Sequence, residues 1–146
     1  MGLMALSWTT EMSVGDELVD RQHREILALT AKMADCAKRP GGREEAFPVL
    51  TSLLASLDEH FADEERQMLD TRYAGADAHR REHEAMSRTL RTLRASVRFP
   101  AELIRSTITI LPRWIAAHQA NQDSGLSRHA ALLVGVTSCL PVASRF

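Results

Sequence analysis

The chain has 146 residues, which is enough for one domain with a hydrophobic core of its own. A formal net charge of −1 gives no electrostatic reason to expect nucleic acid or an anionic membrane as a partner. Cys36 and Cys139 are too few for a disulfide framework and lie too far apart for a metal motif. The N-terminus has no basic segment followed by an apolar stretch, and no uncharged run reaches the about 20 apolar residues of a membrane-spanning helix. We therefore expect a soluble, cytoplasmic protein without a membrane-inserted segment.

Four stretches carry apolar residues at helical spacing and are separated by residues that end helices. The first is closed by the strong stop Arg39-Pro40-Gly41-Gly42, and Pro48 fits the first turn of the second. The first stretch begins near Asp16 or Asp20, the second near Glu44–Pro48 and the fourth at Pro100, and the third follows Tyr73-Ala74-Gly75-Ala76. Four helices of about 20 residues joined by short links predict an all-α, up-down-up-down four-helix bundle.

The two ends of the chain differ from the helical stretches. Leu6 to Asp16 is typical of an extended N-terminal arm, and we expect Trp8 to pack against the bundle. After Asp123 the sequence changes character, and its Ala/Leu/Val-rich part is compatible with either a short helix or a strand-like tail. We therefore place the bundle in residues 1–126 and a C-terminal tail in residues 127–146.

Five of the six histidines fall on inward-facing positions of the predicted helices. His60 and Glu64 are four residues apart, so on a helix they project from one side, with about 5–6 Å between their Cβ atoms. His79 and His83 repeat this spacing on the next helix, and His23 faces inward from the first. His118 and Asp123 are five apart, so Asp123 must reach around the helix or sit in a loosened last turn.

A single inward histidine is more often a hydrogen-bonded core residue than a ligand. Imidazoles and carboxylates on apolar stripes would each carry a desolvation penalty of several kcal/mol unless they were paired or bound to metal. Seven donors are too many for one tetrahedral zinc and suit two six-coordinate ions bridged by carboxylates. Ferritin-like di-iron sites use mostly glutamate, whereas this set is rich in nitrogen, a reasonable setting for reversible oxygen binding.

The sequence resembles the hemerythrin family, and within it the single-domain bacteriohemerythrins. The resemblance covers roughly Leu6 to Leu126, and every ligand position of the family is filled in order. It is carried by the arm Trp8-Thr9-Thr10-Glu11-Met12-Ser13-Val14-Gly15, by Asp20-Arg21-Gln22-His23, by the HFxxEE motif His60-Phe61-Ala62-Asp63-Glu64-Glu65 with Met68 and Tyr73, by the HxxxH motif His79-Arg80-Arg81-Glu82-His83, and by the WxxxHxxxxD motif from Trp114 through His118 to Asp123.

The resemblance implies a cofactor of two non-haem iron ions, Fe2+ or Fe3+, with an oxo or hydroxo bridge. It implies that His79, His83 and His118 hold one iron. His23 and His60 would hold the other, which keeps an open position for dioxygen. Glu64 and Asp123 would bridge the pair. Phe61, Trp114 and Ile115 resemble the apolar pocket that protects the bound oxygen.

Three positions depart from the family pattern or lie outside it. Gln119 stands where the family usually carries an apolar residue; its amide would either hydrogen-bond the bound ligand or admit water, or else face the surface. Pro112 removes one backbone hydrogen bond from the fourth helix and is expected to kink it. His129 is expected to face solvent.

Three functions share such a centre. The first is reversible dioxygen binding for storage, transport or delivery to an oxygen-consuming enzyme. The second is a di-iron peroxidase or nitric-oxide-handling enzyme, which Gln119 favours, and the third is an oxygen or redox sensor that acts on a separate partner. The chain shows no output domain and no general acid–base pair beyond the ligands, so we rank the carrier first and expect no enzyme.

Overall fold

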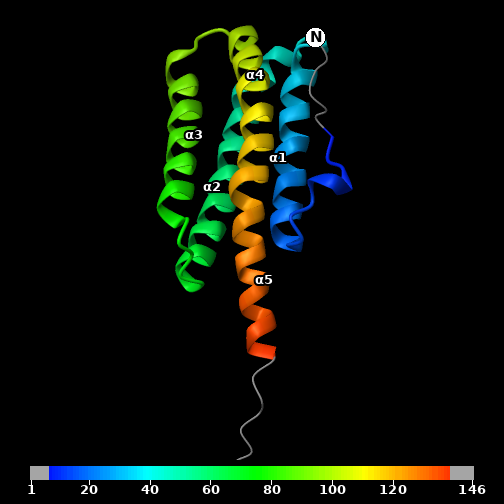
Figure 1. Cartoon of the computed structure of the whole chain (residues 1–146). Helices are drawn as coiled ribbons and strands as arrows, with labels where there is room; N and C mark the ends of the chain where they lie inside the picture. The colour runs from blue at the N-terminus through cyan, green and yellow to red at the C-terminus, as the bar shows by residue number, and fades with distance from the viewer. Residues whose placement is uncertain (1–6, 139–146) are drawn as a thin grey trace, which may run out of the picture.

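The structure, a computed structural model, describes residues 7–138; Leu6 of the expected arm, Cys139 and residues 140–146 of the expected tail lie outside the described residues. Within this range the regular elements are all helical, and the four long helices form the predicted up-down-up-down bundle (Figure 1). These helices are α1 (Glu17–Cys36), α2 (Ala46–Asp70), α3 (Ala76–Ser96) and α4 (Pro100–His118). α1 packs against α2 and α4, and α2 packs against α3. No helix in residues 7–138 is long and apolar enough to cross a bilayer.

The predicted inward faces form the core of the bundle. Large side chains that are fully buried come from every helix, and they include Ile26, Leu50, Leu53, Leu57, Leu90, Ile104 and Leu111. Leu93, Val97 and Ile108 are only partly buried and pack at the margin of this core. Truncating one fully buried leucine to alanine typically lowers the free energy of unfolding by about 2–5 kcal/mol. The packing of these side chains therefore fixes how the four helices lie against one another.

Residues 7–16 connect to α1 through the carboxylate of Asp20. This carboxylate accepts hydrogen bonds from Ser13 Oγ at 2.5 Å and from the Val14 amide at 2.9 Å. Trp8 packs against α1, with the Arg24 guanidinium 4.1 Å from the ring centroid. The segment contains one 3-10 turn at Thr10–Met12, η1, and therefore is not extended throughout.

α4 runs through Pro112 without interruption and continues into two further helical elements. Gln119–Asp123 form a π-helical turn, η3, and Ser124–Ser138 form α5. α5 extends the line of α4 past the end of the bundle, as the orange segment of Figure 1 shows. Of the two structures that the sequence allowed for this segment, the helix is the one observed. The predicted boundary after residue 126 falls inside α5.

The expectation that His129 faces solvent is wrong. Its side chain is half-buried, its Nε2 lies 2.9 Å from the carbonyl oxygen of Thr71, and its ring centroid lies 5.2 Å from that of Tyr73. The cause is the continuation of α4 into α5, which carries His129 to the C-terminal end of α2. Gly125 permits this approach, because a Cβ atom there would lie 2.9 Å from Tyr73 Oη.

We expect His129→Ala to lower the free energy of unfolding by about 1 kcal/mol, the net value of one intramolecular hydrogen bond. The measurement is urea unfolding followed by circular dichroism. Arg128→Ala is the matched control, because the Arg128 side chain is exposed on the same helix. Equal stability of the two variants would show that the Thr71 contact contributes nothing.

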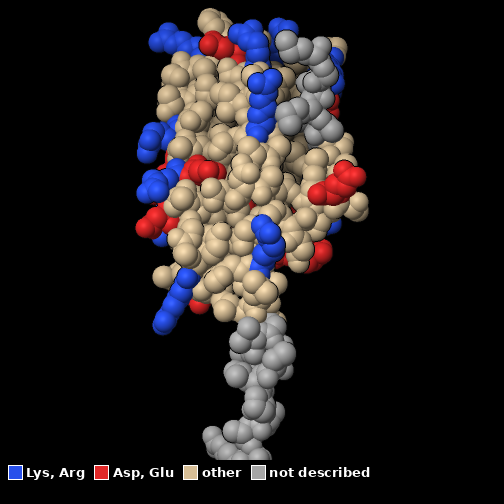
Figure 2. Space-filling view, in the orientation of Figure 1, with Lys and Arg blue, Asp and Glu red and all other residues tan. Residues whose placement is uncertain are grey.

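Charged side chains are interspersed on the face of the molecule shown in Figure 2, where both blue and red atoms lie along the edge formed by α3. Arg80 pairs with Asp77 at 3.6 Å, and Arg91 forms an ion pair with Asp58 of α2. Arg80 and Arg91 of α3 thus have acidic partners, as on a solvated helix face.

Candidate metal centre

Seven polar side chains from all four long helices and η3 meet in the interior of the bundle. The predicted ligands are His23 from α1, His60 and Glu64 from α2, His79 and His83 from α3, His118 from α4 and Asp123 from η3. Each is at most 3% exposed, so water cannot compensate their polarity. The sequence pattern named every one of these residues, and the structure brings all of them together.

The donor atoms divide into two groups. In one, the nitrogens of His79, His83 and His118 and the oxygens of Glu64 and Asp123 lie within 4.8 Å of one another. In the other, donors of His23, His60 and Asp123 lie within the same distance. This division into three and two histidines is the one that the family resemblance implies.

Both carboxylates contact histidines of both groups. Glu64 Oε2 lies 3.0 Å from His79 Nε2 and 3.5 Å from His60 Nε2. Asp123 Oδ1 lies 3.0 Å from His118 Nε2, and its Oδ2 lies 2.8 Å from His23 Nε2. Each carboxylate therefore stands where it could share its charge between two ions.

The π-helical turn explains how Asp123 reaches this position. A π-helix pairs residue i with residue i+5, whereas an α-helix would leave two residues that are five apart on different faces. η3 begins directly after His118 and ends at Asp123, and both side chains enter the same cluster. The loosened last turn that the sequence allowed is the arrangement observed.

The donor set fits a metal pair better than a hydrogen-bonded core. Glu64 Oε1 is buried without a hydrogen-bond partner among the described residues. Three of the five imidazoles also donate outward from Nδ1, to Gln22, Glu65 and Glu82. This outer bond orients the rings so that Nε2 of His60, His83 and His118 faces the cluster, where a bound metal ion would take the Nε2 lone pair in place of a proton.

Opposite charges hold the metal-free cluster together. Burial alone would raise the pKa of the Glu64 carboxyl, but hydrogen bonds to His118, His79 and His83 lower it to about 2. Burial would lower the pKa of the His118 imidazole, whereas Asp123 and Glu64 raise it to about 10. A metal ion takes the place of such protons, so its binding releases them.

For the metal-free protein we expect the highest free energy of unfolding between about pH 4.5 and about pH 6.5. The stabilisation from His118 is complete below its ordinary pKa of 6.5 and is lost as the pH rises through about 10. That from Glu64 is complete above its ordinary pKa of 4.5 and is lost as the pH falls to about 2. Urea unfolding across this pH range tests the expectation, and stability that rises steadily above pH 6.5 would contradict it.

Aromatic side chains cover one side of the cluster. The Phe61 ring stacks on the His83 imidazole with 4.0 Å between centroids, and the Trp114 ring stacks on that of His118 at 4.3 Å. Phe61 and Trp114 also contact each other edge to face at 5.7 Å. These two residues of the expected apolar pocket therefore lie directly against the histidines.

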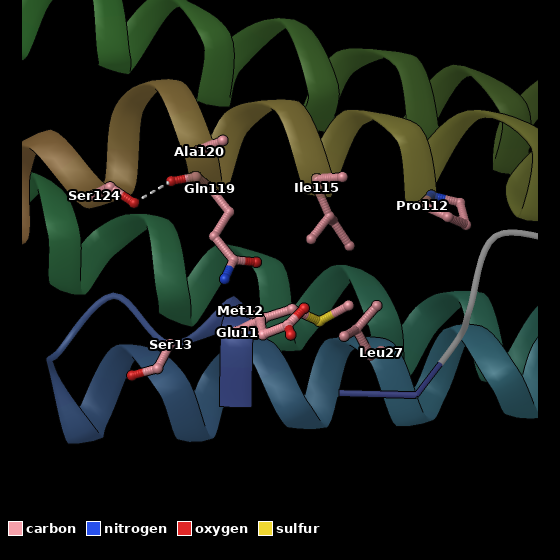
Figure 3. A pocket seen from close by; sticks show the side chains of 10 residues that line it. Glu11, Met12, Ser13, Leu27, Pro112, Ile115, Gln119, Ala120 and Ser124 are labelled. Carbon is pink, nitrogen blue, oxygen red and sulfur yellow. Dashed lines mark hydrogen bonds between the residues drawn. The ribbon is translucent and has the colours of Figure 1, made fainter. Parts of the chain in front are cut away.

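Gln119 faces a cavity of about 380 Å³ between α1, α4 and the N-terminal segment. Figure 3 shows its side chain extending from the helix toward Glu11 and Met12, with Leu27 and Ile115 beside it. Gln119 is 7% exposed, so the alternative of a surface orientation is wrong. The polar amide of Gln119, the residue that follows His118 in sequence, thus lies in an otherwise largely apolar cavity.

Some residues around the site were not singled out from the sequence. Their side chains bond the outer nitrogens of three histidines: His60 Nδ1 donates to Gln22, His83 Nδ1 to Glu65 and His118 Nδ1 to Glu82. The Gln122 amide in turn donates to Glu82. Gln22 precedes His23, and the other three lie within or beside the ligand motifs, which was the available signal.

Comparison with known proteins agrees with this geometry. The family model described as "Hemerythrin HHE cation binding domain" matches residues 14–130. A bacteriohemerythrin of Pseudomonas aeruginosa (strain LESB58) is 28% identical over 122 residues, which cover 82% of this chain and 78% of the relative. One of Campylobacter jejuni (serotype O:6) is 26% identical over 119 residues, covering 81% and 90%. One of Stenotrophomonas maltophilia is 25% identical over 118 residues, covering 81% and 76%. The chain belongs to the hemerythrin family.

Proposed function

We propose that this chain binds dioxygen reversibly at a non-haem di-iron centre and stores, transports or delivers it in the cytoplasm, with an oxygen-consuming enzyme as the recipient. The observation that carries the proposal is the unequal division of nitrogen donors between two groups that share carboxylates. The bacteriohemerythrins similar to this chain support the same assignment.

The division of donors has a direct consequence for coordination. If Glu64 and Asp123 both bridge, and one oxo or hydroxo group is shared, the ion of His79, His83 and His118 has six donors. The ion of His23 and His60 then has five, and its sixth position is open to a ligand. Iron held there would supply the electrons that reversible oxygen binding requires, and the smaller donor set of His23 and His60 would leave room for the ligand.

The surroundings of the centre favour binding over turnover. Phe61 and Trp114 stack on ligand imidazoles, and Ile115 is 5% exposed beside the cavity. We propose that these three side chains exclude water and acid from the bound oxygen.

Absorption spectroscopy tests the function directly. The iron-loaded protein is reduced, exposed to air and then returned to an oxygen-free atmosphere. We expect a ligand-to-iron absorption band that appears in air and disappears when oxygen is removed, over repeated cycles. Immediate and lasting oxidation of the iron would contradict the proposal.

One observation favours a second function, a di-iron peroxidase or nitric-oxide-handling enzyme. The buried amide of Gln119, which directly follows His118 in sequence, lines a cavity large enough for a small substrate. Turnover of hydrogen peroxide or nitric oxide by the iron-loaded protein, with no reversible band, would select this alternative.

A further inference from the structure

We propose that the outer hydrogen bonds of the histidines strengthen the three-histidine position beyond the effect of its third imidazole, so that carboxylates Glu65 and Glu82 direct the first and tighter ion there. The inference rests on the metal centre of the proposed function but does not require dioxygen binding. It assigns a positioning role to residues that do not touch the metal.

On the three-histidine side, two ligands donate to carboxylates. His118 Nδ1 lies 2.7 Å from Glu82 Oε2, and Gln122 Nε2 holds the other oxygen of Glu82 at 3.0 Å. His83 Nδ1 lies 3.1 Å from Glu65 Oε1. Two negative charges therefore stand directly behind two of the three imidazoles.

On the two-histidine side, no carboxylate of residues 7–138 is in direct contact with an outer nitrogen. His60 Nδ1 donates to Gln22 Oε1, a neutral amide, at 2.9 Å. Asp63 lies one step further out, where it accepts from Gln22 Nε2 at 2.7 Å and is paired with Arg66 at 2.6 Å. His23 Nδ1 has no partner in the described part of the chain. The net charge behind this pair of imidazoles is therefore close to zero.

This difference changes the strength of the ligands. An imidazole that donates to a carboxylate gains electron density and becomes a stronger base at Nε2, and loss of such partners typically costs 10–100-fold in metal affinity. The carboxylates also attract the cation, although the Glu65 and Glu82 side chains are 37% and 41% exposed and water screens them. The effect therefore acts mainly through the hydrogen bonds to His83 and His118.

The experiment is an anaerobic titration of the metal-free protein with Co²⁺, followed by calorimetry and by the visible spectrum of the bound ion. We expect two binding phases separated by about 10–100-fold in affinity. His23→Ala is expected to remove the weaker phase only, and His83→Ala the tighter phase only. Two equal phases in the wild-type protein would overturn the inference, whatever the variants do.

Variants that remove or add a charge next to the outer nitrogens test whether the carboxylates cause the difference in affinity. Glu82→Gln and Glu65→Gln keep an acceptor oxygen but lose the charge, and each is expected to weaken the tighter phase about tenfold. Gln22→Glu is expected to strengthen the weaker phase. Glu84→Gln, exposed on the same helix as Glu82, is the matched control and should change neither. If Glu82→Gln weakened both phases equally, Glu82 would not act specifically on the three-histidine position and the inference would be wrong.

The outcomes separate this inference from the proposed function. Two ions bound with equal affinity would refute the asymmetry and leave the di-iron centre standing. A wild-type protein that binds no ion would refute both. Two unequal phases without reversible oxygen binding would refute only the carrier function.

Discussion

Asp123→Ala is expected to abolish iron binding at both positions, whereas His23→Ala is expected to leave one ion bound. The difference follows from geometry, because Asp123 contacts donors of both groups and His23 belongs to one. Glu64→Ala should lose iron as Asp123→Ala does, and His60→Ala should behave as His23→Ala. Iron per chain is measured on purified protein by elemental analysis.

The same substitutions should lower stability, because the free energy of metal binding contributes to folding. Removing one carboxylate also leaves buried imidazoles without their counter-charge, a loss of roughly 3–5 kcal/mol when a buried pair is broken. Asp77→Ala is the control, since that side chain is exposed at the start of α3. If Asp123→Ala kept both irons, Asp123 could not be the bridging ligand. If His60→Ala kept both irons, the assignment of His60 to the two-histidine position would be wrong.

The helices and the convergence of the candidate ligands were predictable because both depend on local spacing. Residues three and four apart face the same side of a helix whatever the helix packs against. The i,i+4 pair His79 and His83, and the pair His60 and Glu64, therefore entered the cluster as expected. Convergence of four such faces follows from the up-down-up-down order once the loops are short.

Features that depend on packing between distant segments were less predictable. His129 carries no local signal for its partner, because Thr71 lies 58 residues earlier and approaches only when α4 continues into α5. Glu82 resembles any other charge on α3, and its contact with His118 joins two helices. The spacing of His118 and Asp123 allowed either an Asp123 side chain that reaches around the helix or a loosened last turn, but it did not predict a π-turn followed by a further helix.

Gln119→Leu is expected to slow the oxidation of the oxygenated iron centre in air about tenfold, a barrier increase of about 1.4 kcal/mol. The amide lines the cavity beside Ile115 and provides polar atoms that can hold water, whereas leucine has a similar size and none. The measurement is the rate at which the absorption band decays in air at fixed pH. Asn121→Leu is the matched control, because Asn121 is exposed in the same π-turn. An unchanged rate in Gln119→Leu would mean that the amide does not affect oxidation, and a higher rate would mean that it protects the bound ligand rather than admitting water.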